Sequence, residues 1–301
     1  MDERALLADQ FEEHRPRLRA LAYRMLGSHS EAEDAVQEAW LRLDRSDSGG
    51  VENLGGWLTT VVGRVCLNML RSRGSRREQF LEGPWGETPE ARMPDPIVDR
   101  EDEIDPEHQA LLADGIGLAL LVVLETLSPS ERIAFVLHDT FGVPFDEIAP
   151  IVGRSPAASR QLASRARRRV RGEATVPDAD GSRQREVVAA FLAASRDGDL
   201  GALLAVLDPD VVLRVDPGAA GTSREVRGAR AVAEQARAFS HLGRYSRRAL
   251  VNGVSGIVSR APGGPTFSVM GFAVANGKIT EIDILADRQR LRLLDLAFLD
   301  D

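Results

Sequence analysis

The residues best placed to do chemistry in this chain are arginines gathered in one short segment. Between Arg154 and Gly172 there are seven arginines and no acidic residue. Guanidinium groups bind phosphates through paired hydrogen bonds, and a row of them without neighbouring acids favours a polyanion as partner. The segment therefore predicts a nucleic-acid contact, and a solvated arginine-rich surface helix is the alternative.

A helix-turn-helix pattern brings these arginines to one surface. Apolar residues recur at helical spacing from Phe145 to Val152, and Gly153 permits a sharp turn. Ser155 followed by Pro156 is a typical helix start. The apolar stripe expected on the inward face of the second helix is Ala158, Leu162, Ala166 and Val170. The residues expected on the opposite face are Arg160, Ser164, Arg167, Arg168 and Arg171.

A second arginine-rich face is expected between Asn53 and Arg73. Its polar positions recur at helical spacing and are Thr60, Arg64, Asn68 and Arg71. Gly74 is expected to end the helix, and Arg76 and Arg77 follow at once. From Arg64 to Arg77 there are five arginines and no acid. Such a face can follow a phosphate backbone while bases stack on guanidinium planes.

A third helix, predicted from Ser30 to Leu43, has two regular faces. Ser30 and Glu33 have the spacing of a capping box, and apolar residues up to Leu43 form the inward stripe. Four other residues follow i, i+3, i+4, i+7 on a second face, namely Asp34, Gln37, Glu38 and Leu41. This acidic face with one exposed leucine fits a basic protein partner, and a solvated acidic face is the alternative.

Composition limits the class of protein. The 301 residues suggest two or three domains, and 43% hydrophobic with 28% charged residues is typical of a globular chain. The sequence has no signal pattern and no long apolar run, so we expect a cytoplasmic protein without a membrane segment. The single Cys66 and five scattered histidines predict no disulfide, no metal site and no cofactor.

The net charge of -8 is concentrated in one segment. Residues 87–107 contain nine acids and two arginines, and the prolines around them predict an extended linker over 84–110. A second boundary is expected near 175–182, where proline, aspartate and glycine follow the arginine helix. The chain therefore divides into helical blocks at 8–83 and 111–172 and a third block at 183–301.

The third block changes from helical to strand-like patterns. A helical stretch from Arg185 to Leu207 precedes strand-like runs at 211–215, 245–251, 256–260, 267–275 and 278–285. Asn276-Gly277 between the last two runs is a strong hairpin signal. Helices followed by an antiparallel sheet predict an α+β domain.

Three stretches over residues 8–172 resemble bacterial extracytoplasmic-function sigma factors. They are Glu33–Trp40, Gly56–Asn68 and Leu127–Arg132, and they lead into the helix-turn-helix in the family's order and spacing. The third block resembles the SnoaL-like cone-shaped α+β fold, a combination known in one sigma subgroup. The resemblance implies a multidomain protein with two all-α sigma domains, region 2 at 8–83 and region 4 at 111–172, and a SnoaL-like regulatory domain at 183–301.

The resemblance also implies roles and partners. Asp34, Gln37, Glu38 and Leu41 would bind the core RNA polymerase. A second set would capture and melt the downstream promoter element, namely Arg64, Asn68, Arg71, Arg73, Arg76 and Arg77. The helix with Ala157, Arg160, Gln161, Ser164, Arg167, Arg168 and Arg171 would read the upstream element in the major groove. The C-terminal domain would contact the sigma domains and the acidic linker.

The chain departs from the family pattern at several motifs. The usual acid at the position of Asn68 is missing, and residues 84–89 match the subgroup's linker motif only in part. The glycine-rich motif after the first C-terminal strand is altered at 216–221, as is the last motif at 287–291. Regulation is therefore expected to differ from the subgroup pattern.

Two other readings remain open at this point. The C-terminal block could be an enzyme or a small-ligand receptor, and its candidate acid and base groups are Asp216, Asp283, His241 and Tyr245. Fold resemblance does not establish such chemistry. A plain helix-turn-helix repressor would leave the first 83 residues unexplained.

Overall fold

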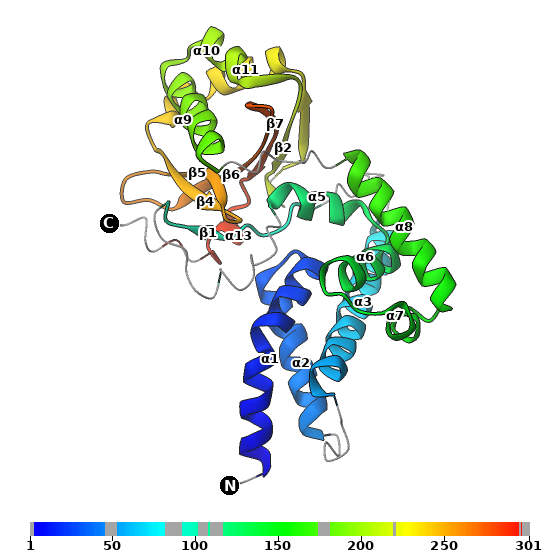
Figure 1. Ribbon diagram of the computed structural model, residues 1–301. Helices are drawn as coiled ribbons and strands as arrows, with labels where there is room; N and C mark the ends of the chain where they lie inside the picture. The colour runs from blue at the N-terminus through cyan, green and yellow to red at the C-terminus, as the bar shows by residue number, and fades with distance from the viewer. Residues whose placement is uncertain are drawn as a thin grey trace. The chain divides into compact units, whose positions relative to one another are not determined.

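The computed structural model describes residues 3–45, 53–81, 92–101, 108, 117–173, 181–218, 221–294 and 296 (Figure 1). The chain divides into two compact units. The first contains Met1–Pro94 and Val123–Glu173, and the second contains Asp95–Val122 and Ala174–Asp301. Within the described residues, we find no helix whose length and apolar character would let it cross a membrane.

The first unit begins with three long helices, α1 (Glu3–Leu26), α2 (His29–Arg45) and α3 (Leu54–Leu81). α2 begins at His29, so Ser30 does not cap it as predicted, and Glu33 instead forms ion pairs with Arg15 and Arg19. The prediction that Gly74 ends α3 is also wrong, because the helix continues to Leu81. Cys66 is buried in this helix, and burial raises the pKa of its thiol, so it is an inert core residue.

The second part of this unit is built from short helices. They are the end of α5 (Leu118–Thr126), α6 (Pro129–Phe135), the π-helical turn η2 (Val136–Thr140), α7 (Phe145–Val152) and α8 (Pro156–Glu173). Ser128 and Glu131 form a capping box at the start of α6. Gly153 ends α7 with φ 73°, and Ser155 Oγ accepts from the Ala158 amide at 3.2 Å at the start of α8. The helix-turn-helix is thus confirmed.

The two helical parts of the first unit pack against each other through α3. Gly63 lies in this contact, where an added Cβ would be 3.5 Å from Ile133 and 3.6 Å from Leu137. Arg132 is almost fully buried and donates to the Met25 carbonyl at 2.9 Å and to Glu125 at 2.7 Å. A buried guanidinium between two helical parts is costly to leave without partners, so these bonds fix how the parts fit.

The second unit is built on a seven-stranded sheet in the order β1-β4-β5-β6-β7-β2-β3. The strands are β1 (Val98–Asp99), β2 (Leu207–Asp216), β3 (Arg224–Arg227), β4 (Ser246–Val251), β5 (Val254–Arg260), β6 (Thr266–Ala275) and β7 (Lys278–Leu285). All five predicted strands are present. The sheet is not wholly antiparallel as expected, because β2 pairs parallel with β7. β1 and β3 were not predicted, and β1 comes from the linker.

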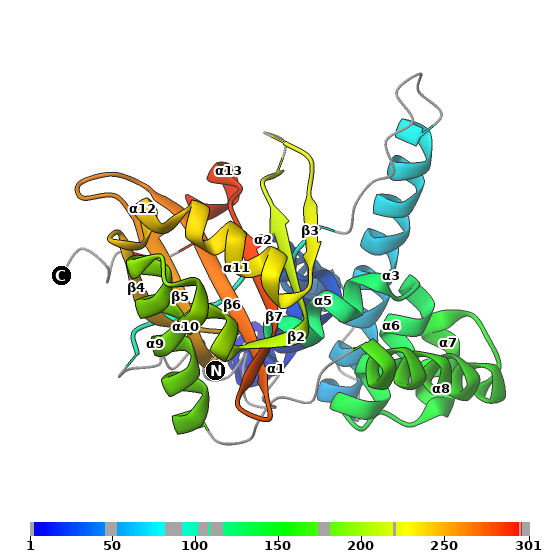
Figure 2. The same cartoon turned by 90° about the horizontal axis from the view of Figure 1, so that it is seen from above.

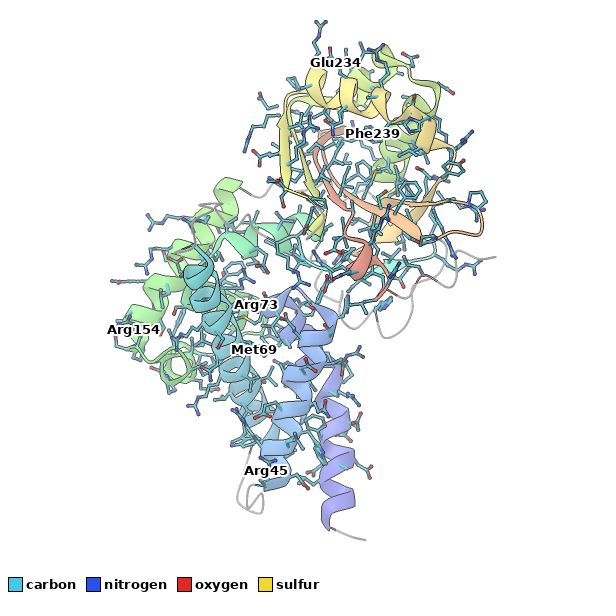
Figure 3. All side chains as sticks on the ribbon, turned by 180° about the vertical axis from the view of Figure 1, so that it is seen from behind. Arg45, Met69, Arg73, Arg154, Glu234 and Phe239 are labelled. Carbon is cyan, nitrogen blue, oxygen red and sulfur yellow. The ribbon has the colours of Figure 1, made fainter. Side chains whose placement is uncertain are left out.

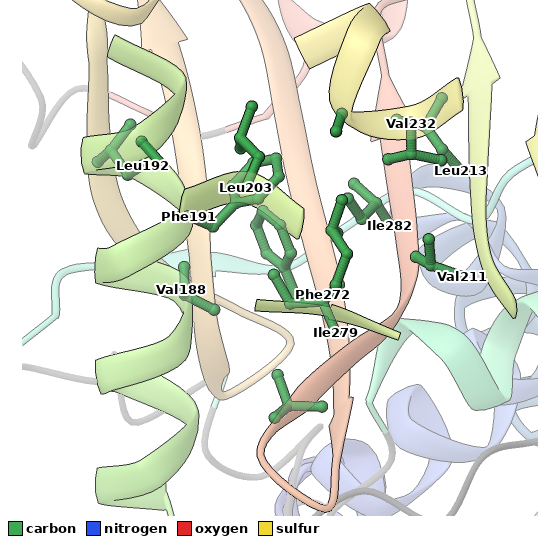
Figure 4. Close-up of a cluster of buried hydrophobic side chains, with 14 of the residues drawn as sticks. Val188, Phe191, Leu192, Leu203, Val211, Leu213, Val232, Phe272, Ile279 and Ile282 are labelled. Carbon is green, nitrogen blue, oxygen red and sulfur yellow. The ribbon is translucent and has the colours of Figure 1, made fainter. Parts of the chain in front are cut away.

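Helices cover one face of this sheet (Figures 1 and 2). They are α9 (Gly181–Asp197), α10 (Leu200–Val206), α11 (Ala229–Ala238) and α12 (Ser240–Gly243), and α13 (Arg288–Leu291) follows the last strand. Apolar side chains fill the space between helices and sheet, with Phe191 and Phe272 edge to face at 5.4 Å (Figure 4). Asn276 and Gly277, with φ 54° and 71°, make the predicted hairpin turn.

The opposite face of the sheet carries a buried group of charges. Arg214 donates to Glu281 at 2.8 Å and to Asp283 at 3.1 Å, and both carboxylates are almost fully buried. Two buried carboxylates share one guanidinium here. Burial raises the pKa of Asp283 to about 6, Arg214 opposes this shift, and the nearby Glu281 adds to it.

This group makes stability depend on pH. Because the pKa of Asp283 is higher in the native protein than its usual 3.8, the group favours folding at low pH and loses that contribution as pH rises through about 6. The side chain in Asp283→Asn is neutral at every pH. Above about pH 7, we therefore expect the free energy of unfolding of this variant, measured by denaturant titration, to exceed that of wild type by on the order of 1–3 kcal/mol. This difference in the free energy of unfolding should shrink toward about pH 4. A difference that does not change with pH would show that ionisation of Asp283 is not its cause.

Candidate nucleic-acid interface

The outward face of α8 presents the predicted polar residues. Ser159, Ala163 and Ala166 are buried against the rest of the helix-turn-helix, so the inward seam is rotated slightly from the predicted stripe. The exposed residues on the other side are Ala157, Arg160, Gln161, Ser164, Arg168 and Arg171. α8 therefore offers a continuous polar and basic face without an acid.

Three of the seven arginines in this segment point back to the protein. Arg165 pairs with Glu131 at 2.9 Å, and Arg169 donates to the Thr126 carbonyl at 3.1 Å. Burial alone would raise the pKa of Glu131, but hydrogen bonds from Ser128 and Arg165 lower it. The third, Arg167, binds Asp139 through two nitrogens, one of them at 2.8 Å. A phosphate would have to compete with Asp139 for Arg167, which was predicted to contact DNA.

Arg160 is held in place at the start of α8. Its guanidinium lies 5.2 Å from the centre of the Phe145 ring, which belongs to α7. Stacking on an aromatic face orients a guanidinium and lowers the entropy that it loses on binding. Arg160 is exposed and lies near the N-terminal end of α8, the part of a recognition helix that contacts base edges.

The face predicted on α3 is only partly available. Arg64, Asn68 and Arg71 are exposed, and Arg71 also lies 3.5 Å from the Val152 carbonyl. Arg73 instead forms an ion pair with Glu31 and donates to the Leu26 carbonyl at 3.0 Å. The side chains of Arg76 and Arg77 lie outside the described residues.

A groove of about 310 Å³ runs between α2 and α3 beside this face. Its lining residues are Glu31, Glu38, Arg42, Val65, Asn68, Met69, Ser72 and Arg73. Met69 and Arg73 lie one turn apart on α3 (Figure 3). Two acids and two arginines line the groove, so its charges largely balance and the exposed positive charge is concentrated at Arg64 and Arg71.

The acidic face of α2 is exposed as predicted. Asp34, Gln37 and Leu41 are exposed, whereas Trp40 packs against Phe11 with ring centres 5.0 Å apart. Glu38 forms an ion pair with Arg42 one turn later at 2.9 Å, and both side chains are 44% exposed. Such a surface pair contributes little to stability, so Glu38 remains available to a partner.

Part of the acidic linker is built into the second unit. β1 pairs antiparallel with β4, with Val98 opposite Val251. The Ile97 amide donates to the Asn252 side chain at 3.2 Å, and the Asn252 amide donates to the Ile97 carbonyl at 2.7 Å. Further along the linker, Glu101 accepts from Arg248 at 3.1 Å. These residues lie at the edge of the sheet, whereas residues 84–91, 102–107, 109 and 110 of the linker expected over 84–110 lie outside the described residues.

Arg290, on α13 after the last strand, binds the linker. Its Nε donates to Asp95 at 2.6 Å and its Nη1 donates to Asp216 at 2.8 Å. All three side chains are buried. Asp216 opens the altered glycine-rich motif, and Arg290 belongs to the altered last motif. Sequence reasoning singled out both motifs but missed their joint partner Asp95, which only the fold brings to them.

The four candidate catalytic residues have separate partners. Asp216 binds Arg290, and Asp283 binds Arg214. Tyr245 lies under the Arg244 guanidinium, with 4.6 Å between them. His241 is exposed on α12, with its ring centre 6.5 Å from that of Phe239. This arrangement provides ion pairing and packing rather than a shared acid and base.

Comparisons with known proteins agree with the sequence motifs. Residues 10–76 match Sigma-70 region 2, and residues 117–170 match Sigma-70, region 4. The chain is 44% identical over 222 residues to the ECF RNA polymerase sigma factor SigJ of Mycobacterium tuberculosis, covering 73% of this chain and 68% of that protein. It is 36% identical over 282 residues to the probable ECF RNA polymerase sigma factor SigI of the same species, covering 92% of both.

A solved structure is similar along almost the whole chain. The crystal structure of the M. tuberculosis extracytoplasmic function sigma factor SigJ matches with a TM-score of 0.75 at 34% identity. The match covers 96% of this chain and 99% of that one. The helical regions and the C-terminal sheet domain thus recur together in a related protein.

The orientation of Arg160 predicts that its replacement would reduce discrimination between bases at one position of the DNA. An arginine that contacts a guanine contributes about 1–3 kcal/mol of discrimination, so Arg160→Ala should relax preference at one upstream promoter position. Arg171→Ala, at the distal end of the same face, should weaken binding to all sequences alike. Selection from a promoter library with a randomised upstream element measures both, and an unchanged preference in Arg160→Ala would exclude it as a base reader.

Proposed function

Because the chain belongs to the extracytoplasmic-function (ECF) RNA polymerase sigma factors, we propose that the exposed faces of α2, α3 and α8 each have a separate role in promoter recognition. A sigma factor directs core polymerase to promoters, and both sigma regions are present in order. The α2 face would bind the core enzyme, the α3 face would bind the downstream element, and α8 would read the upstream element. The proposed domain bounds are 8–83, 111–172 and 183–301, with a linker at 84–110.

The observation that best supports the docking role is the surface of α2. Asp34, Gln37 and Leu41 are exposed on one side of a helix whose other side is fully packed. The face combines negative charge with one apolar side chain that is 38% exposed. Charge complementarity accelerates encounter with a basic partner surface, and an apolar contact adds affinity.

Charge reversal on this face tests the docking role. Asp34→Lys with Glu38→Lys should abolish co-purification with core polymerase, because it repels a basic partner. Asp9→Lys with Glu13→Lys is the matched control, since these acids are also exposed and one turn apart, on α1. Both variants should keep the wild-type circular dichroism. Retention of core binding by the Asp34 and Glu38 variant would show that α2 is not the docking face.

The C-terminal domain is proposed to be a SnoaL-like cone that regulates the sigma regions through the linker. Its twisted sheet, with helices over one face, has the arrangement expected of that fold. The apolar packing around Phe191 and Phe272 favours a structural role for the interior over the alternative of a ligand receptor or enzyme. The separate partners of the candidate catalytic residues support the same choice.

Capture of the linker offers a physical mechanism for this regulation. Residues 95–101 connect region 2 to region 4, and seven residues fully extended span at most about 24 Å. While they are held along β4 and by Arg290, these residues are fixed to the domain, so only the rest of the linker can change the distance between the two regions. We therefore expect the domain to limit the distance between the promoter elements that the protein can engage together.

Arg290→Gln should release the linker. Breaking a buried ion pair takes a charged partner from both carboxylates and costs about 3–5 kcal/mol. Hydrogen–deuterium exchange should therefore become faster in the peptide that contains Ile97 and Val98. Transcription should shift toward promoters with a longer spacer between the two elements.

The matched control is Arg288→Gln, on the same short helix, because Arg288 is exposed. Its exchange and spacer preference should equal those of wild type. A melting curve of each variant separates release of the linker from unfolding of the whole domain. Wild-type exchange at Ile97 in a folded Arg290→Gln protein would refute capture through Arg290, and an unchanged spacer preference would refute the regulatory role.

A further inference from the structure

A pocket of about 230 Å³ lies at one end of β4 and β5 in the C-terminal domain. We call it the arginine pocket, and its lining residues are Arg244, Tyr245, Arg247, Val258, Arg260, Ala261, Pro262 and Gly263. It lies on the face of the sheet opposite the apolar core, because Val258 alternates with Ile257, which belongs to that core. The pocket is therefore separate from the interior of the cone.

Strand geometry brings the basic groups together. Arg247 lies directly opposite Val258, and the Arg260 amide donates to the Tyr245 carbonyl at 2.9 Å. Residues opposite one another in an antiparallel pair share a face, so Arg247 and Arg260 emerge on the same side of adjacent strands. Arg260 is half-buried and its Nε donates to the Gly264 carbonyl at 2.8 Å, which fixes its guanidinium beside the β5–β6 turn.

The described lining of the pocket is basic. Three guanidiniums and a phenol line it, and no lining residue within the described part of the chain is acidic. Arg244 lies over the Tyr245 ring at 4.6 Å, so an aromatic face orients it. Other arginines of the same domain are engaged differently, since Arg214 and Arg290 each bind two buried carboxylates.

We propose that the arginine pocket binds the phosphate or pyrophosphate group of a small soluble ligand. Guanidinium donors match phosphate oxygens in pairs, and the tyrosine hydroxyl can donate a further hydrogen bond. The three positive charges converge on one small pocket, which favours a single group with two or more negative charges. A DNA backbone instead presents a line of singly charged phosphates, which suits arginines spread along a surface.

Calorimetric titration of the full-length protein with inorganic pyrophosphate tests this proposal. We expect saturable binding of one pyrophosphate at this pocket at moderate salt. Arg244→Gln with Arg247→Gln should weaken it by about tenfold or more, since a hydrogen bond to a charged group contributes about that factor. Arg227→Gln with Arg230→Gln is the matched control, because these arginines have the same spacing and are 69% and 84% exposed.

The possible outcomes separate the alternatives. Loss of affinity in the pocket variant alone, with an unchanged melting temperature, supports the proposal. No binding, or equal binding by the wild type and both variants, overturns it, because the anion then has no site here. Unchanged pyrophosphate affinity together with a reduced salt dependence of duplex DNA binding in the pocket variant also overturns it and assigns the pocket to a DNA backbone.

Discussion

The buried ion pairs of Arg290 are the contact on which the organisation of the C-terminal unit depends. One guanidinium joins Asp95 of the linker to Asp216 of β2. Each charge is removed from water, so losing the guanidinium would take a charged partner from both carboxylates, which is costly in a buried site. The linker between two promoter-binding regions thereby becomes part of a third domain. In the proposed regulation, the segment that connects the two regions is the one that the domain holds.

The helical unit uses a similar device in a different place. Arg132 of α6 is buried near the end of α1, where it donates hydrogen bonds to the Met25 carbonyl and to Glu125. Gly63 of α3 lies in the contact with Ile133 and Leu137. The two sigma regions consequently form one packed unit in this structure. Their faces α3 and α8 remain exposed, so packing constrains their spacing without covering the residues proposed to bind DNA.

Arginine therefore has two uses in this protein. Arg73, Arg132, Arg167, Arg214 and Arg290 hold elements together through carboxylates or carbonyls. Arg64, Arg160 and Arg168 are exposed on faces without acids. The arginine pocket joins this second group, because its described lining is basic and contains no acid. Counting arginines cannot separate the two uses, because both have the same residue type and charge.

The sequence by itself determined the two helical blocks, five of the seven described strands, the helix-turn-helix and the exposed face of α2, because these follow from local periodicity and turn residues. Only the tertiary structure decided which arginines are engaged and that the linker supplies β1. Arg290 lies 195 residues from Asp95, and Arg132 lies 107 residues from Met25. No local pattern encodes such pairs. Their energy depends on burial and on the approach of distant segments, which exist only once the chain has folded.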